Sequence, residues 1–370
     1  MVRTIHCSGS HYEIGLAYGR AAEDLIAKSL ENYREHFKAT CGLSMDELLA
    51  TARQVGATLK AKVPHLYEEI QGIAKGSRCQ VDDIILLNAR SEIVLTAGTA
   101  HAKLENLGGC STYGQLYNGQ VWAAQNWDWN SNQRDQLVHL ILEPDGKPKC
   151  HIMTEAGLVG KVGLNSYGVA TNVNAIKASN LDLDKLPLHV LLRIPMEHKN
   201  GASAVKEMQS VGAASVGHVM ISDATGNNSF ETNPDGPWAV NRADEHGRVF
   251  HTNHVIVPDR SATIKDDVIV PDTFPRLDRL RQLVQQHLRT NAGDDREPSA
   301  DEQAKSPPSY DSISSLLKDE QGSPFGICRI GNSDQPVETI FSIVTNCSEK
   351  KAKVAIGIPN NVREWVELSF

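Results

Sequence analysis

The spacing of apolar residues changes once along the chain. Over roughly the first hundred residues, apolar positions recur at the spacing of amphipathic helices, as in EIGLAYGRAAEDLIAKSLENYREHF and HLYEEIQGIAKGSR. A helix is expected in SMDELLATARQVGATLKAKV, because Ser44 and Glu47 have capping-box spacing and Pro64 follows. Asp82 or Asp83 is placed to begin another helix. The pattern predicts a helical first part.

From Gly108 onward the pattern is typical of β-strands. Short runs of strand character recur between turn residues, in GQVWAAQNWDW, LVHLILEP, KCHIMTEAG and KVGLNSYGVATNVNAI. PLHVLLRIPMEH, GASAVKEMQSV and TFPRLDRLRQLVQQHLRT interrupt them with helical patterns, and TIFSIVTNCSEKKAKVAIGIP predicts a terminal hairpin. This order of elements predicts an α+β protein with a layered sheet core.

Residues 291–312 differ from the rest of the second part. The stretch NAGDDREPSADEQAKSPPSYDS is rich in charge, proline and serine and poor in apolar residues. Such a composition cannot bury enough apolar surface to order itself. We expect a flexible insertion on the surface there, not a linker between domains.

Composition excludes several classes of partner. The chain has 370 residues and a formal net charge of −8, with no basic stripe, so neither nucleic acid nor an anionic membrane is an expected partner. No apolar run approaches the roughly 20 residues of a membrane helix, and the N-terminus lacks the apolar segment of a secretory signal. The seven cysteines are scattered, odd in number and without a CxxC pair. We therefore expect free thiols, no metal and no cofactor.

Cys110 is the candidate nucleophile, because it follows Gly108 and Gly109 and begins a strand-like run. A thiol needs a lowered pKa or a base, and the local signature of papain-like enzymes is absent. Cutting the bond before Cys110 would create an α-amine with a pKa of about 8, which could act as the base. Gly109 has no Cβ to block the sulfur from its carbonyl. On these residues alone, a turn followed by a buried strand cysteine is the alternative.

The wider sequence resembles a known family. GGCSTYGQLYNGQVWAAQNWDW resembles the cleavage-site region of the acyl-CoA:6-aminopenicillanic-acid acyltransferase (isopenicillin N acyltransferase) family, which combines Gly-Cys-Thr/Ser, NG and QNWD. Further motifs occur in the order that family shows: EIGLAYGRAA, YEEIQGIAKG, LLNARSE, TEAGLVGKVGLNSYGVATNVNA, HTNH and PFGICR. The resemblance therefore extends over most of the chain.

The resemblance implies a fold and a maturation by self-cleavage. The expected fold is the N-terminal nucleophile (Ntn) αββα four-layer sandwich, with a helical N-terminal segment. The expected precursor cleaves itself between Gly109 and Cys110 into an α-chain, 1–109, and a catalytic β-chain, 110–370. The implied partners are a small-molecule amide or acyl-CoA donor, an amine acceptor and the cleaved α-chain.

The resemblance also implies roles for single residues. Cys110 is the nucleophile that carries the acyl group. Asn253 in HTNH matches the oxyanion-hole asparagine, and Asp128 in QNWDW matches a position whose backbone N–H is the second donor. Arg329 in GICR matches an arginine close to the nucleophile, where it would stabilise a thiolate or a bound carboxylate. Without the resemblance, Asn253 could be a turn residue, Asp128 a carboxylate at the end of a strand, and Arg329 a member of a surface ion pair.

Competing functions remain open from the sequence. The chain could transfer an acyl group to an amine, give it to water as an amidohydrolase, or be a non-catalytic binding module of the same fold. The end of the sequence, Leu368-Ser369-Phe370, does not match the peroxisomal tripeptide of the penicillin-pathway enzymes. We therefore expect a cytoplasmic paralogue whose product need not be a penicillin.

Overall fold

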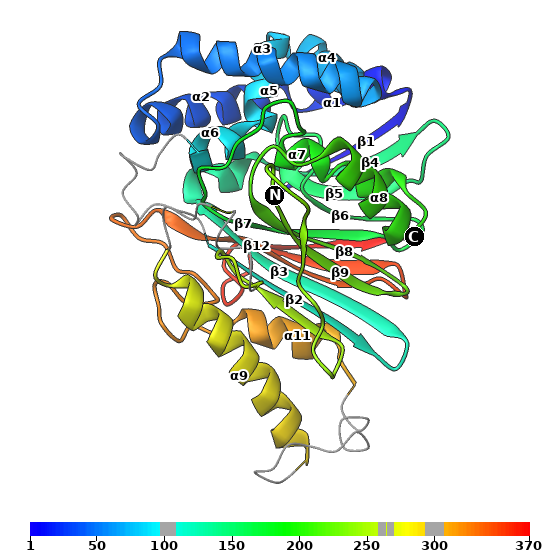
Figure 1. The fold of residues 1–370 in the computed structure, drawn as a ribbon, viewed down its shortest axis with the longest axis vertical. Helices are drawn as coiled ribbons and strands as arrows, with labels where there is room; N and C mark the ends of the chain where they lie inside the picture. Colours follow the sequence, from blue (N-terminus) through cyan, green and yellow to red (C-terminus); the bar gives the residue numbers. More distant parts are fainter. Residues whose placement is uncertain (97–108, 258–263, 265–269, 293–306) are drawn as a thin grey trace.

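The computed structural model of the chain has four layers, and it describes residues 1–96, 109–257, 264, 270–292 and 307–370. Two β-sheets face each other, with helices on the outer side of each (Figure 1). The central strands of the sheets are buried along their length, such as β12 (Val337–Asn346), whereas the edge strands are partly exposed. The αββα sandwich expected for this α+β chain is thereby confirmed.

The first sheet has the order β1-β4-β5-β6-β7-β8-β9-β10. The strand β1 pairs with β4 in parallel, and every other described pairing in either sheet is antiparallel. The strands are β1 (Arg3–Gly9), β4 (Leu137–Pro144), β5 (Cys150–Glu155), β6 (Val162–Asn165), β7 (Ala170–Ala175), β8 (Gly217–Asp223), β9 (Gly226–Thr232) and β10 (Ala239–Val240).

The second sheet carries the Gly-Cys step. Its order is β11-β2-β3-β12-β13-β14, so β2 lies between β11 and β3. The remaining strands are β2 (Cys110–Tyr117), β3 (Gln120–Asn130), β11 (Arg248–His251), β13 (Lys351–Ile356) and β14 (Glu364–Ser369). The expected terminal hairpin is β12–β13, and β14 extends it by one strand.

The helices divide between the two outer layers (Figure 1). The second sheet is covered by α9 (Thr273–Ala292) and α11 (Tyr310–Leu317). The first sheet is covered by α1 (His11–Ala21), α2 (Glu23–Thr40), α3 (Met45–Lys62), α4 (Pro64–Ser77), α5 (Val81–Asn88), α6 (Arg90–Thr96), α7 (Leu188–Leu191) and α8 (Gly201–Val211). Among the residues with an assigned position, no helix is long and apolar enough to cross a bilayer.

The helices α1 and α4 are in direct backbone contact through glycines. A Cβ added to Gly15 would lie 2.0 Å from the carbonyl oxygen of Glu69, and one added to Gly72 would lie 2.3 Å from that of Tyr12. Gly19 and Gly76 are equally crowded by the opposite helix. Four glycines at four-residue spacing therefore bring the two helices together, and no other residue fits at these positions.

The first part of the chain differs from the sequence expectation in two ways. It contributes β1 to the core sheet, so it is not purely helical, and its long helical run breaks at Ala22 between α1 and α2. The capping box of Ser44 and Glu47 is confirmed. The predicted insertion at 291–312 has helical ends, since α9 runs to Ala292 and α11 begins at Tyr310, and residues 293–306 lie outside the described part.

Candidate active site

Cys110 begins β2 and pairs in register with Trp127 of β3. Its side chain is buried, and burial raises the pKa of the thiol to about 11. The preceding peptide is held by the neighbouring strand, because the backbone N–H of Asp128 donates to the Gly109 carbonyl oxygen at 3.0 Å. A donor thus already polarises the carbonyl next to the candidate nucleophile.

Asn253 lies beside the nitrogen of Cys110. Its Oδ1 accepts a hydrogen bond from the Cys110 backbone N–H at 2.8 Å, and its Nδ2 donates to the Ala175 carbonyl at 2.8 Å. The Thr273 hydroxyl accepts from the Asn253 backbone N–H at 2.7 Å. In this uncleaved chain, Asn253 therefore holds the nitrogen of the Gly-Cys peptide, and its Nδ2 is committed to Ala175.

Arg276, which sequence reasoning did not single out, makes the most contacts around this peptide. Its Nη1 donates to the Cys110 carbonyl at 2.8 Å, and its Nη2 donates to Asn253 Oδ1 at 2.9 Å. Its Nε donates to Asp272 at 2.7 Å. The only local signal was a four-residue Asp-Arg spacing in an arginine-rich helix.

Arg329 lies in the same group of charges and is only 2% exposed. It forms an ion pair with Asp272, and its Nε lies 3.6 Å from Asp128 Oδ2. Asp128 Oδ1 accepts from the Thr339 hydroxyl at 2.6 Å. Burial raises the pKa of Asp128 to about 6, although Arg329 opposes that shift. We call Asp128, Asp272, Arg276 and Arg329 the arginine cluster. Arg329 is buried in this cluster, so its ion pair is not on the surface.

The arginine cluster explains why residue 109 is glycine. A Cβ on Gly109 would lie 2.9 Å from the Nη2 atoms of both Arg276 and Arg329. Gly109 is not among the glycines with positive φ, so the requirement is one of space and not of backbone conformation.

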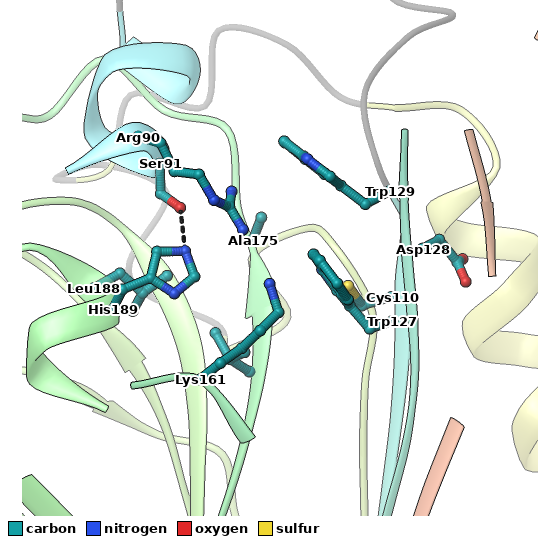
Figure 2. A pocket seen from close by; sticks show the side chains of 11 residues that line it. Arg90, Ser91, Cys110, Trp127, Asp128, Trp129, Lys161, Ala175, Leu188 and His189 are labelled. Carbon is teal, nitrogen blue, oxygen red and sulfur yellow. Dashed lines mark hydrogen bonds between the residues drawn. The ribbon is translucent and has the colours of Figure 1, made fainter. Parts of the chain in front are cut away.

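A small cavity of about 30 Å³ lies on the other side of the peptide, toward the first sheet (Figure 2). Trp127 and Trp129 face it from β3, whereas the carboxylate of Asp128 points away, as expected for alternating strand residues. Arg90 and Ser91 reach it from α6, so both parts of the chain line it. The lining residues are Arg90, Ser91, Cys110, Trp127, Asp128, Trp129, Lys161, Val173, Ala175, Leu188 and His189.

A second group of buried charges lies at the cavity wall, where Arg90 and Lys161 line the cavity and Glu155 pairs with both behind them. We call Arg90, Glu155 and Lys161 the lysine cluster. Glu155 Oε2 accepts from Arg90 at 2.6 Å and from Lys161 Nζ at 3.0 Å. Lys161 Nζ also lies 3.0 Å from the centre of the Trp127 ring. Burial lowers the pKa of Lys161 to about 7, against the attraction of Glu155. The sequence offered no signal for this lysine beyond its place in a family motif.

Among the described residues, His251 and His254 belong to no group with the spacing of metal ligands. His251 lies against Glu231, 3.0 Å from its carboxylate, and stacks on His218. Elsewhere, one described group has metal-like spacing: His11, His65 and Glu197. Glu197 is already compensated there, with Arg193 at 3.1 Å and Lys147 at 3.4 Å. We assign no metal to it.

The four-layer fold places the Gly-Cys step at the start of a strand in the second sheet. Residues 116–361 match the family "Acyl-coenzyme A:6-aminopenicillanic acid acyl-transferase". The chain belongs to this family. It is 31% identical over 369 residues to the "Acyl-coenzyme A:6-aminopenicillanic-acid-acyltransferase 40 kDa form" of Emericella nidulans, a match that covers 99% of this chain and 96% of the relative.

Two solved structures show weaker similarity. Penicillin V acylase from Agrobacterium tumefaciens is 15% identical with a TM-score of 0.38, over 67% of this chain and 83% of that chain. A mutant of the conjugated bile acid hydrolase from Clostridium perfringens is 11% identical with a TM-score of 0.45, over 70% of this chain and 92% of that chain.

Proposed function

We propose that this chain is a self-processing cysteine enzyme that carries an acyl group on Cys110 as a thioester and transfers it to an amine. The observation that carries the proposal is the hydrogen bond from the Asp128 N–H to the Gly109 carbonyl, next to the buried thiol. Such a donor would stabilise an oxyanion at the one peptide whose cleavage would free the α-amine of Cys110.

Self-cleavage would use the site as it stands. Cys110 Sγ attacks the Gly109 carbonyl carbon, and the developing oxyanion is stabilised by the Asp128 N–H. The Gly109–Cys110 C–N bond breaks, the nitrogen leaves as an amine, and Gly109 becomes a thioester on Cys110. Water then hydrolyses that thioester, which releases the Gly109 carboxylate and restores the thiol.

Acyl transfer would use the new terminus. Asn253 Oδ1, which now accepts from the Cys110 nitrogen, would hold the free α-amine as it takes the thiol proton. The thiolate takes the acyl group from the donor, and the amine acceptor then attacks the thioester. Once Gly109 has left, Asn253 Nδ2 would have to give up Ala175 to serve as an oxyanion donor.

We infer that the fragments 1–109 and 110–370 stay together. β1 would remain paired with β4, and Arg90 and Ser91 of the first fragment line the cavity beside Cys110. A first fragment that left would remove one wall of this cavity.

The family name supports a choice of substrates. We propose a CoA thioester or an amide as the donor and a small amine, such as 6-aminopenicillanic acid, as the acceptor. An amidohydrolase that gives the acyl group to water is the alternative, since it differs only in how well water is kept from the thioester. A non-catalytic binding module is disfavoured because it would have no use for the polarised Gly109 carbonyl.

Intact-mass analysis of the purified protein tests these proposals. In proportion to their lengths, the fragments of the 40.4 kDa chain should weigh roughly 12 and 28 kDa and should co-elute under native conditions. Incubation with a panel of acyl-CoAs and amides should add an acyl mass to the larger fragment. Rates with and without added amine then separate transfer from hydrolysis. A chain that stays full-length and unacylated would refute the proposal.

A further inference from the structure

Self-cleavage has a requirement that the mature enzyme does not share. In the uncleaved chain the nitrogen of Cys110 is an amide that donates to Asn253 Oδ1, so it cannot accept the thiol proton. Burial raises the pKa of the thiol to about 11, so little thiolate forms spontaneously near neutral pH. Another group must therefore take the proton before Cys110 can attack Gly109.

Most of the polar groups that line the cavity with Cys110 cannot act as this acceptor. Arg90 remains charged and donates to Glu155. The carboxylate of Asp128 points away from the cavity, toward Arg329 and Thr339 (Figure 2). His189 lies 3.2 Å from the Ser91 hydroxyl, and burial pushes its pKa well below the usual value, so it is a weak base.

Among the described residues that line the cavity, Lys161 is the remaining titratable group, and its position suits the task. Its amine points across the cavity toward the strands that carry Cys110 and Trp127 (Figure 2). The cavity of about 30 Å³ has room for about one water, and a general base can act directly or through one water. Apart from Cys110, the charged or titratable groups facing Lys161 are Glu155, Arg90 and His189.

We propose that Lys161 is the proton acceptor for Cys110 during self-cleavage, a role that rests on the proposed function and ends when the α-amine is released. The neutral amine of Lys161 takes the proton from Sγ, and the thiolate forms the S–C bond to Gly109. As the C–N bond breaks, the proton passes from Lys161 to the leaving nitrogen. The lysine is thereby regenerated, and no other reactant except water is consumed.

The surroundings of Lys161 keep it available as a base. Glu155 and the Trp127 ring favour the ammonium, whereas burial and Arg90 favour the neutral amine. With a pKa of about 7, a large share of Lys161 is neutral at pH 7 and nearly all of it at pH 9. Self-cleavage should therefore slow as pH falls through 7 and level off above it.

The test follows full-length chain made by cell-free translation and measures the appearance of the two fragments on denaturing gels between pH 6 and 10. We expect the wild-type rate to level off above about pH 7. Lys161→Met should slow cleavage by roughly 10²–10⁴-fold, the usual contribution of a general base. Its residual rate should rise about tenfold per pH unit, because unassisted thiol ionisation then limits it.

Two further variants separate proton transfer from charge. Lys161→Arg keeps a cation for Glu155 but cannot accept a proton, so it should cleave as slowly as Lys161→Met. In Lys161→Ala, added methylamine should restore cleavage in proportion to its free-base concentration. Lys147→Met, which changes a lysine with a 42% exposed side chain, is the matched control and should cleave like the wild type. Thermal unfolding of each variant, compared with that of the uncleaved Cys110→Ala chain, checks that the variant folds.

Several outcomes would overturn the assignment while leaving self-processing intact. One is a folded Lys161→Met chain that cleaves at the wild-type rate, and another is wild-type speed in Lys161→Arg. A third needs no variant: a wild-type rate that keeps rising tenfold per unit to pH 10 would exclude a base with a pKa near 7. If the wild type does not cleave at all, the proposed function itself fails.

Discussion

The lysine cluster and the arginine cluster lie on opposite faces of the second sheet, with the Gly109–Cys110 peptide between them. Both are buried and both combine cations with carboxylates. They differ in chemistry on the two sides of the peptide: Lys161 lines the cavity with Cys110 and has a pKa of about 7, whereas the Asp128 carboxylate points away from that cavity and the guanidinium groups stay protonated. On the cavity side Lys161 can thus exchange a proton, and on the other side Arg276 and the Asp128 backbone N–H hold the peptide through hydrogen bonds.

The clusters also differ in origin. Arg90 of the lysine cluster comes from the first part of the chain, and Glu155 and Lys161 come from the second. All four residues of the arginine cluster come after residue 109. We infer that the arginine cluster would survive separation of the two fragments, whereas the lysine cluster would lose Arg90 and keep only the Lys161–Glu155 pair.

Removal of the thiol should have the largest effect, since both clusters act on it. Cys110→Ala should fold and remain a single chain without acyl transfer. Cys110→Ser should cleave slowly and transfer poorly, because a hydroxyl ionises far less readily than a thiol. Intact mass and transfer rates measure both variants. Two fragments from Cys110→Ala would mean that another protease cuts the chain, and full transfer activity in it would exclude a covalent intermediate.

Loss of Asn253 should come next. Asn253→Ala removes the acceptor for the Cys110 nitrogen and leaves Arg276 Nη2 without that partner. We expect turnover of cleaved enzyme to fall roughly 10²–10³-fold with folding preserved. Asn241→Ala is the control, because the Asn241 amide also donates to a backbone carbonyl, that of Phe250, at 3.1 Å but away from Cys110. Near-normal turnover in Asn253→Ala would remove the residue from the mechanism.

The sequence predicted the elements around the site better than the contacts between them. The alternation in QNWDW was enough to predict a strand, and it places Trp127 and Trp129 opposite Asp128. Lys161 and Arg276 could not be assigned in this way, because Lys161 reaches the site across the cavity from the first sheet and Arg276 reaches it from α9, which lies beside β2. Those contacts join residues far apart in sequence, and local patterns carry no information on them. The resemblance to a family supplied Asn253 and Arg329 where periodicity could not.

The strand β1 was missed for a similar reason. RTIHCSG has only two buried side chains, Ile5 and Cys7, and its other five positions are exposed or half-buried. So short an alternation is a weak signal on its own, and the strand is stabilised by parallel pairing with β4, more than a hundred residues away. Its neighbour α1, by contrast, carries its own capping box at Ser10 and Glu13.

Crowding of the Gly109 carbonyl by the arginine cluster should have an intermediate effect that falls on one step. The added Cβ of Gly109→Ala would meet both guanidinium groups at 2.9 Å, and because their hydrogen bonds and ion pairs hold these groups in place, we expect the peptide to shift away from the Asp128 N–H. We expect self-cleavage to slow roughly 10²-fold, the scale for a misplacement of about 1 Å. Turnover per cleaved molecule should stay normal, because residue 109 has then left the site.

Gly236→Ala is the control, because it replaces a glycine by alanine at a position that is not crowded. Its Cβ would meet nothing nearer than Asn233 Nδ2 at 3.4 Å, so cleavage should be unchanged. If Gly109→Ala cleaves at the wild-type rate, the guanidinium groups of Arg276 and Arg329 move aside for the Cβ and do not fix the position of the Gly109 carbonyl.

The smallest effect is expected from the carboxylate of Asp128, since its backbone N–H is the group that contacts Gly109. Asp128→Asn keeps that donor, so self-cleavage should stay within about tenfold of wild type, well short of the loss of an oxyanion donor. A loss above 100-fold would show that the carboxylate acts directly.

The Asp128 carboxylate should instead affect how the stability of the chain depends on pH. The folded-state pKa of Asp128, about 6, lies above the unfolded value of about 3.9, so the folded chain binds the extra proton between these values. This group therefore adds stability as pH falls from 6 toward 4, and Asp128→Asn lacks that gain. Urea unfolding measures this in the Cys110→Ala background at pH 4.5 and 7. The free energy of unfolding of the Asp128→Asn chain, relative to that of Cys110→Ala alone, should be higher at pH 7 than at pH 4.5. An equal difference at both values would mean that Asp128 is ionised in the folded chain throughout.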